Sequence, residues 1–295
     1  MKGAAMARIP GGPCDLCPRR CGADRRAGEV GACGQGASMR LAAASIHRGE
    51  EPPISGSRGS ATLFFSGCPL ECVFCQNYPI SQLGHGREVG PEELARKMIA
   101  LEARGAHNVN LVTAGHFAPL AVESVERARA DGLSLPVVWN SSGYESLETV
   151  DLLRGTVDIY LSDIKYGRDE NARAFSGAPA YWSTATAAAR AMLEQVGPLR
   201  LDRDGIATRG LIVRHLVLPG GASGLERVAA FVAGELGPDV PLSLMSQYFP
   251  AFRARDFPPL DRATTGAERR EALETARDAG IRRGWSQDPE LSGGA

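Results

Sequence analysis

Three cysteines stand close together in the run Gly67-Cys68-Pro69-Leu70-Glu71-Cys72-Val73-Phe74-Cys75. Their C-x3-C-x2-C spacing allows three thiolates to bind three irons of a cubic iron–sulfur cluster and leaves the fourth iron without a protein ligand. An iron with an open position can bind a substrate or a cofactor. The run follows an apolar segment at residues 61–65, which predicts a strand, so we expect the cysteine loop to begin at a strand end.

Length and composition are those of an ordinary globular protein. The chain has 295 residues, of which 43% are hydrophobic and 23% charged, so it is long enough for one large domain or two smaller ones. A net charge of -1 gives no general attraction to nucleic acid or to an anionic membrane surface. No apolar run reaches the roughly 18 residues of a membrane span. Residues 1–13 lack the apolar core of a secretory signal, so we expect a cytoplasmic protein.

All seven cysteines lie between Cys14 and Cys75. In a reducing cytosol such clustering favours metal binding over disulfides. A disulfide-stapled secreted module is the alternative, but the length of the chain and the start of its sequence argue against it.

Strand-like and helix-like segments alternate after residue 60. The first sixty residues read as irregular, and Pro52-Pro53 with Gly56-Ser57-Arg58-Gly59 predicts an extended connection without room for a helix. The alternation predicts an α/β fold with a parallel sheet, either doubly wound or a (β/α) barrel. Residues 199–209 are expected to be an insertion with a turn at Asp204-Gly205. Strands are predicted at residues 61–65, 108–113, 136–140, 157–163, 210–218 and 242–246, and helices at 91–104, 119–130, 145–153, 180–196, 224–234 and 264–279.

Polar residues follow the predicted strands at their carboxyl ends. In a barrel these ends meet at one mouth, where active sites form. Turn and capping chemistry is the plain alternative for any single end, but five polar ends in register with a metal loop favour a site. The segments are Thr113–His116, Asn140–Gly143, Ser162–Lys165, Arg214-His215 and Ser246–Tyr248.

The cysteine spacing in this context resembles the radical S-adenosylmethionine (SAM) superfamily, and Phe74 matches the usual aromatic before the last cysteine. The wider chain resembles the branch related to pyruvate formate-lyase activating enzymes, in its PflX-type subgroup. The likeness implies a partial (β/α)6 TIM-like barrel over residues 60–285, a cysteine-rich extension over residues 1–59 and a flexible tail over residues 286–295. The matching stretches are Glu50–Gly56, Phe65–Cys68, Cys75–Tyr78, Asn110–Thr113, Asn140–Glu145, Asp158–Leu161, Arg214–Gly220 and Ser246–Tyr248.

The resemblance also implies a chemistry. Cys68, Cys72 and Cys75 would bind a [4Fe-4S] cluster whose open iron chelates SAM, and reduction would release a 5'-deoxyadenosyl radical for hydrogen abstraction. A flavodoxin- or ferredoxin-type electron donor would be a partner. The radical could activate a glycyl-radical enzyme, or it could modify a small molecule or a peptide directly. No nucleic acid or membrane partner is expected.

Further site residues follow from the resemblance. Activating enzymes carry an Asp-x-Lys after the fourth strand, which corresponds to Asp163 and Lys165 here, with Lys165 pairing with the cofactor carboxylate. An exposed ion pair is the alternative for these two residues. Arg214 matches an arginine that reaches the same carboxylate, and a cation within an apolar strand needs a partner. Asn140 and Ser142 would contact the ribose or the amino group of SAM.

Two features fit less directly. Relatives use a Gly-Gly-Glu-like segment after the second strand to bind the SAM amino group, whereas this chain has Thr113-Ala114-Gly115-His116; backbone carbonyls would have to replace the missing acid. His116 and His215 could contact substrate, but structural roles are favoured.

The remaining cysteines, Cys14, Cys17, Cys21 and Cys33, precede the predicted barrel. Four thiolates can close a tetrahedral zinc or iron site, or hold a second iron–sulfur cluster. Such a site would be structural or electron-relaying, and a disordered arm with incidental cysteines is the alternative. These residues also suggest a rival function for the whole chain, namely a zinc-binding interaction protein with a non-catalytic barrel.

Overall fold

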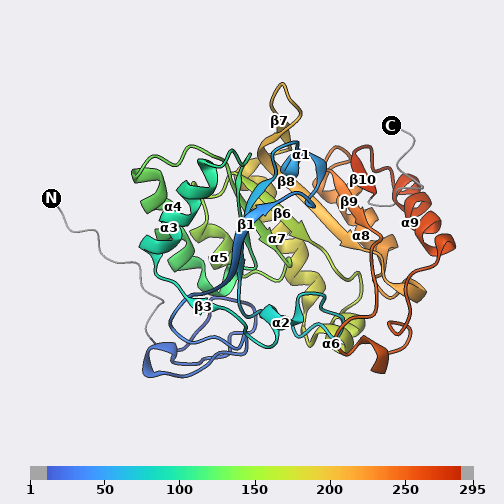
Figure 1. Ribbon diagram of the computed structural model, residues 1–295. Helices are drawn as coiled ribbons and strands as arrows, with labels where there is room; N and C mark the ends of the chain where they lie inside the picture. The colour runs from blue at the N-terminus through green and yellow to red at the C-terminus, as the bar shows by residue number, and fades with distance from the viewer. Residues whose placement is uncertain (1–11, 287–295) are drawn as a thin grey trace.

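The computed structural model describes residues 12–286 of the chain, and a parallel sheet forms its centre (Figure 1). The order of neighbouring strands is β10-β9-β8-β6-β5-β4-β2-β1-β3, and each neighbouring pair in this order from β10 to β2 is parallel. The six predicted strands are present, and the partial (β/α)6 TIM-like barrel is confirmed. They are β2 (Ser60–Phe65), β4 (Val109–Val112), β5 (Val137–Ser141), β6 (Ile159–Asp163), β8 (Ala207–Leu216) and β9 (Leu242–Met245).

Helices connect the strands and pack on the outside of the sheet (Figure 1). α3 illustrates the local logic, since Pro91 takes the first position, Glu92 and Glu93 suit the positive N-terminal turn, and Leu94 and Met98 are buried. The predicted helices are present with ends shifted by a few residues. They are α3 (Pro91–Glu102), α4 (Ala118–Ala130), α5 (Leu147–Leu152), α7 (Tyr181–Val196), α8 (Leu225–Phe231) and α9 (Gly266–Asp278).

The first sixty residues are more ordered than the sequence indicated. β1 (Arg40–His47) pairs antiparallel with β2, and α1 (Pro52–Ser55) forms one helical turn. The prediction of an irregular segment without room for a helix was therefore wrong. Its error was to treat the two prolines as helix breakers, although a proline in the first turn loses no intrahelical hydrogen bond.

α1 closes one end of the barrel from inside. Ile54 is fully buried and packs in one cluster with inward-facing residues of three strands, among them Val138, Leu161 and Ile212. Residues 50 and 51 come directly before α1 and belong to the connection between β1 and this helix. The chain before residue 60 thus contributes to the barrel itself.

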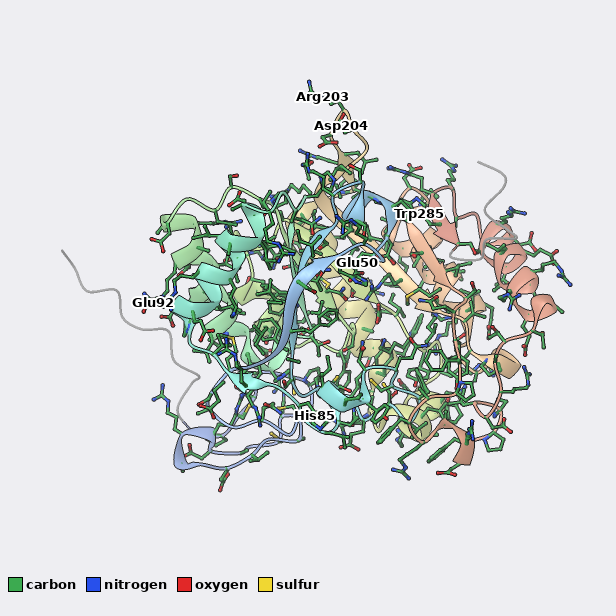
Figure 2. The ribbon with its side chains drawn as sticks, viewed as in Figure 1. Glu50, His85, Glu92, Arg203, Asp204 and Trp285 are labelled. Atoms are coloured by element: carbon green, nitrogen blue, oxygen red, sulfur yellow. The ribbon has the colours of Figure 1, made fainter. Side chains whose placement is uncertain are left out.

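The hairpin of β7 (Arg200–Leu201) with β8 confirms the predicted insertion. Asp202 accepts hydrogen bonds from the backbone of Asp204 and Ile206 and so stabilises the turn. Figure 2 shows Arg203 and Asp204 at the hairpin tip, while His85 lies toward the opposite end of the molecule.

Some short elements were not predicted. They are β3 (Arg87–Glu88), α2 (Tyr78–Ser81), α6 (Asp169–Ser176) and β10 (Gly284–Ser286). The proposed tail over residues 286–295 starts at the last residue of β10, and residues 287–295 lie outside the described part of the chain. Within residues 12–286, no helix combines the length and the apolar character needed to cross a membrane.

Candidate functional site

One cavity at the carboxyl ends of the strands collects the predicted residues of the barrel. Its volume is ≈ 230 Å³. One wall carries the cysteine loop, and the other carries side chains from β5, β6 and β8. The predicted residues on its lining are Cys68, Cys72, Cys75, Asn140, Ser142, Asp163, Lys165 and Arg214. Residues more than 140 positions apart in the sequence therefore meet at one place, as the parallel topology requires.

The cysteine loop is held by backbone hydrogen bonds to other segments. The N–H of Glu71 donates to the carbonyl of Ser176 at 3.0 Å, and the N–H of Val73 donates to that of Phe175 at 2.9 Å. Gly67 opens the loop with φ +81°, and a Cβ at this position would lie 2.6 Å from the carbonyl oxygen of Cys33. Only glycine permits this conformation and this close approach.

The thiols of the loop are set up for metal binding. Burial raises the pKa of Cys72 to about 11 and also raises that of Cys68. Without a metal these thiols stay protonated at neutral pH, and a bound metal displaces the protons because thiolates are its ligands. Each sulfur also has a hydrogen-bond partner: Leu70 N–H for Cys68, Ser176 for Cys72 and Ser81 for Cys75. Three soft sulfurs facing a cavity, one buried and two half-buried, fit an iron–sulfur cluster.

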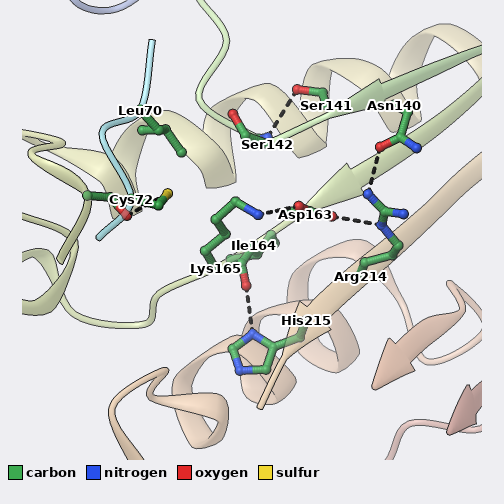
Figure 3. A network of polar contacts seen from close by, with 12 residues as sticks. Leu70, Cys72, Asn140, Ser141, Ser142, Asp163, Ile164, Lys165, Arg214 and His215 are labelled. Atoms are coloured by element: carbon green, nitrogen blue, oxygen red, sulfur yellow. Dashed lines mark hydrogen bonds and ion pairs between the residues drawn. The ribbon is translucent and has the colours of Figure 1, made fainter. Parts of the chain in front are cut away.

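Opposite the loop lies a buried network of charged and amide groups (Figure 3). Asp163 forms ion pairs with Lys165 and, at 2.8 Å, with Arg214. Arg214 also donates to Asn140 at 2.6 Å. Burial opposes the charge on Asp163, but the two cations outweigh it and lower the pKa of its carboxyl. The pair is therefore not an exposed one, because the Asp163 and Lys165 side chains are 8% and 19% exposed.

Glu50 is a site residue that the sequence analysis did not single out. Its carboxylate pairs with Arg214 at 3.1 Å and accepts hydrogen bonds from the amides of Asn110 and Asn140. Glu51 lies beside it, accepts from Ser243 at 3.0 Å and is 3.8 Å from Arg214. The only signal was the stretch Glu50–Gly56 within the resemblance, which carried no assigned role. Arg214 is thus fixed from two sides before any ligand binds.

The segment after β4 departs from an ordinary turn. Thr113 has φ +58°, which is strained for a β-branched residue and often marks a functional position. Thr113 lines the cavity. A Cβ at Gly115 would collide with the carboxylate of Glu145, which is buried and accepts from Ser141 Oγ at 2.8 Å. Burial raises the pKa of Glu145 to about 7. An acid therefore lies against this segment, but it does not line the cavity.

The two histidines considered as substrate contacts lie outside the cavity lining. His116 contacts the carbonyl of Ser66 through Nε2 at 2.8 Å, and His215 contacts the carbonyl of Ile164 through Nδ1 at 2.6 Å. Burial lowers the pKa of each to about 4. Both are neutral, buried and bonded to backbone, in line with the structural role that the sequence favoured.

The four N-terminal cysteines are neighbours of one another and of the cavity loop. A Cβ at Gly31 would lie 3.4 Å from the sulfur of Cys21 and 3.5 Å from that of Cys33. Burial raises the pKa of Cys17 to about 12, with Cys33 and Cys14 adding to the effect. The N–H of Cys68 donates to the carbonyl of Cys33 at 3.2 Å. This backbone hydrogen bond connects the N-terminal cysteine segment to the cavity loop.

No three His, Cys, Asp or Glu side chains within residues 12–286 converge as the ligands of a single metal ion would. In a cluster each cysteine binds a different iron, so this criterion does not apply to the cavity loop. For the N-terminal group it means that a tetrahedral zinc or iron site would need the four thiols to move closer together.

Comparison with known proteins places the chain in a family. The model of the radical SAM superfamily matches residues 62–197, which contain the cavity loop and the Asp163–Lys165 pair. The chain belongs to the radical SAM superfamily. It is also 31% identical over 271 residues to an uncharacterised protein of Methanocaldococcus jannaschii, covering 89% of this chain and 74% of that protein.

One solved structure supports the fold of this radical SAM protein, and a second is reported for its similarity alone. HydG, a maturase of the [FeFe]-hydrogenase, matches with a TM-score of 0.53 and 14% identity, covering 79% of this chain and 53% of the HydG chain. A domain of pyruvate-formate lyase-activating enzyme from Bacteroides vulgatus matches with a TM-score of 0.42 and 12% identity, covering 58% of this chain and 92% of the domain.

Proposed function

We propose that this protein is an enzyme that cleaves SAM reductively and uses the resulting 5'-deoxyadenosyl radical to abstract a hydrogen atom from its substrate. The observation that carries the proposal is the single cavity in which the buried thiol of Cys72 and the half-buried thiols of Cys68 and Cys75 face Asp163, Lys165 and Arg214. Superfamily membership supports the same chemistry. The cluster supplies the electron and the open iron, and the protein supplies ligands, position and exclusion of water.

Each part of the cavity has a proposed role. Cys68, Cys72 and Cys75 hold the [4Fe-4S] cluster. Lys165 offers a cation to the SAM carboxylate, while Arg214, already held by Asp163 and Asn140, contributes positive potential to the same wall. Asn140 and Ser142 line the cavity and offer neutral hydrogen-bonding groups to the amino group or the ribose. Thr113, whose strained backbone follows β4, lines the cavity and would contact the cofactor there.

For the substrate, we propose a protein, as in activation of a glycyl-radical enzyme. One observation favours this choice. Exposed aromatic residues lie next to the cluster loop: Phe249 and Phe252 are 53% and 39% exposed. Phe252 stacks on Tyr78, and Arg253 N–H donates to the carbonyl of Val73 at 2.8 Å. Such residues are enriched at protein interfaces. A flavodoxin- or ferredoxin-type donor would deliver the electron. Direct modification of a small molecule or peptide is the alternative.

The decisive experiment is anaerobic reconstitution of the full chain with iron and sulfide, followed by dithionite and SAM. We expect a broad visible absorbance, a paramagnetic signal in the reduced state and formation of 5'-deoxyadenosine. Cys72→Ala should lose all three. A colourless protein that binds zinc would contradict the proposal and support the rival interaction module. A glycyl-radical signal on an added partner enzyme, or a modified small molecule in its place, would then separate the two substrate classes.

We further propose a second metal centre at Cys14, Cys17, Cys21 and Cys33, supported by the sulfurs of Cys21 and Cys33 beside Gly31 and by the hydrogen bond between Cys14 and Cys21. Metal analysis of wild-type protein and of Cys17→Ala tests it. We expect the variant to lose either zinc or about one cluster equivalent of iron and to keep the catalytic cluster. Equal metal content in the two proteins would reject the second centre.

A further inference from the structure

A hydroxyl chain reaches the buried sulfur of Cys72 from the far side of the cavity loop. Ser176 Oγ lies 2.9 Å from Cys72 Sγ, and Tyr166 Oη lies 2.6 Å from Ser176 Oγ. Both residues are fully buried, at 0% exposure. Neither belongs to a motif in the sequence, and neither lines the cavity.

The direction of these hydrogen bonds follows from proton counting. An iron-bound thiolate has no proton, so Ser176 must donate its single O–H to Cys72. Ser176 then has only acceptor capacity left for Tyr166, so Tyr166 must donate to it. Burial raises the pKa of Tyr166 well above its usual value, which keeps this phenol protonated. The order Tyr166 to Ser176 to Cys72 is therefore fixed once a metal is bound.

The fold holds Ser176 rigidly at this place. It is the last residue of α6, and its carbonyl accepts from the N–H of Glu71 in the cysteine loop at 3.0 Å. Gly177 ends the helix with φ +57°. Tyr166 packs edge-on against the rings of Phe74 and Tyr181, with centroids 6.4 Å and 5.5 Å away. The hydroxyl chain is therefore part of the same contacts between α6 and the cysteine loop that hold the loop in place.

The electrostatic surroundings make this donor significant. On the cavity side, Lys165 and Asp163 form an ion pair with each other, so their opposite charges partly offset each other. α6 also presents its carbonyl end, the negative end of its dipole, to the loop. The Ser176 hydroxyl donates to the sulfur from a fully buried position, where the low local dielectric strengthens such a bond.

We propose that the Tyr166–Ser176 pair tunes the [4Fe-4S] cluster by making its one-electron reduction easier. Reduction adds negative charge to the cluster and its thiolates, and a donor to a thiolate stabilises the reduced form more than the oxidised form. The electron comes from an external low-potential donor. This inference rests on the proposed function, because it takes Cys72 as a cluster ligand. Ser176 and Tyr166 are positioning residues that act through Cys72.

The test is a spectroelectrochemical titration of the anaerobically reconstituted full chain. Ser176→Ala should shift the midpoint potential to more negative values, by up to about a tenfold loss in the reduction equilibrium constant, which equals about 59 mV for one electron. Tyr166→Phe should shift it in the same direction by less, since Ser176 still donates. Ser176→Thr should restore the wild-type value because it keeps a hydroxyl. Ser183→Ala, at an exposed serine on α7, is the matched control and should not change it.

A second readout follows the bond itself. Loss of the hydrogen bond should raise the iron–cysteine stretching frequencies in resonance Raman spectra of Ser176→Ala, which a purely structural role would not do. Unchanged potentials and frequencies at full cluster content would overturn the proposal. If Ser176→Ala fails to hold a cluster, Tyr166→Phe decides by the same criteria. A wild-type chain without any cluster would instead refute the proposed function.

Discussion

The cavity loop and the N-terminal motif use the same residue in two environments. Cys72 lies in a loop that is clamped by α6, faces an ion-pair network and receives a hydrogen bond from Ser176. Cys21 is exposed; burial works against its thiolate, but hydrogen bonds from backbone N–H groups and from Cys14 outweigh this and lower its pKa. The loop is held by long-range backbone contacts, whereas the motif combines local turns, such as Gly22 N–H to Cys14 C=O at 3.1 Å, with a few long-range anchors, such as Arg25 to the carbonyl of His116.

This difference indicates how each group would respond to loss of its metal. The cavity loop has backbone partners that do not depend on the cluster, so its geometry should persist in the empty protein. The N-terminal motif has little apolar material of its own, and its order should depend more on a bound metal. Pre-organisation fits a centre whose iron must meet SAM in one orientation.

The largest expected effect separates the two groups directly. Cys72→Ala should reduce 5'-deoxyadenosine formation by more than about 100-fold, since loss of a direct ligand exceeds the 10–100-fold cost of losing an outer-shell partner. Cys17→Ala should keep measurable cleavage. Product analysis by chromatography after dithionite reduction checks both. Loss of the catalytic cluster in Cys17→Ala would show that the seven cysteines do not divide as proposed.

Glu50→Ala tests the ion-pair network on the cavity side. The change removes a buried partner of Arg214 and leaves the Asn110 and Asn140 amides short of an acceptor. Removing one partner of a buried ion pair costs about 3–5 kcal/mol; because Asp163 still holds Arg214, we expect about 3 kcal/mol. Thermal unfolding measures the stability, and equilibrium binding measures a weaker affinity for SAM. Wild-type values for both would remove Glu50 from the site.

These residues show what sequence can and cannot predict here. The alternation of apolar segments predicted the six parallel strands, and parallel strands bring their polar ends together, so the cavity residues followed. Glu50 was not predicted as a site residue because its partner Arg214 is 164 residues away in the sequence. Glu50 also lies in a segment that was predicted to be irregular. The role of Ser176 was not predicted because a serine at a helix end has no distinctive sequence pattern. Both depend on tertiary placement, which periodicity does not encode.

Arg25→Ala tests how the N-terminal motif is anchored to the barrel. Arg25 is 2% exposed. It donates to the carbonyls of Gly36 at 2.7 Å and His116 at 2.6 Å, and it lies over the Phe117 ring. Two charged hydrogen bonds and a cation–π contact are lost, so we expect about 2–3 kcal/mol of destabilisation. Metal analysis should show loss from the motif with retention of the catalytic cluster; equal loss from both would indicate one cooperative unit.

Glu145→Gln tests a pH effect at the junction of the two regions, where Glu145 adds to the raised pKa of Cys17. The folded protein holds a proton on Glu145 up to about pH 7, whereas the unfolded chain loses it near its ordinary pKa. The wild type therefore loses stability as pH rises between these values, by about 2–3 kcal/mol. Glutamine does not titrate, so the variant should gain that much relative to wild type between pH 5 and pH 8. Parallel unfolding curves at both pH values would contradict the raised pKa.

Arg20→Ala should have the smallest effect, although its ion pair also links the N-terminal motif to the barrel. Arg20 and Glu148 lie 3.0 Å apart, but their side chains are 65% and 70% exposed. Solvent and salt screen such a pair, and ordering two long side chains offsets most of its attraction, so we expect less than about 0.5 kcal/mol. Thermal unfolding beside Arg25→Ala provides the comparison at equal change in charge. A loss as large as that of Arg25→Ala would mean that surface charge, and not burial, attaches the motif to the barrel.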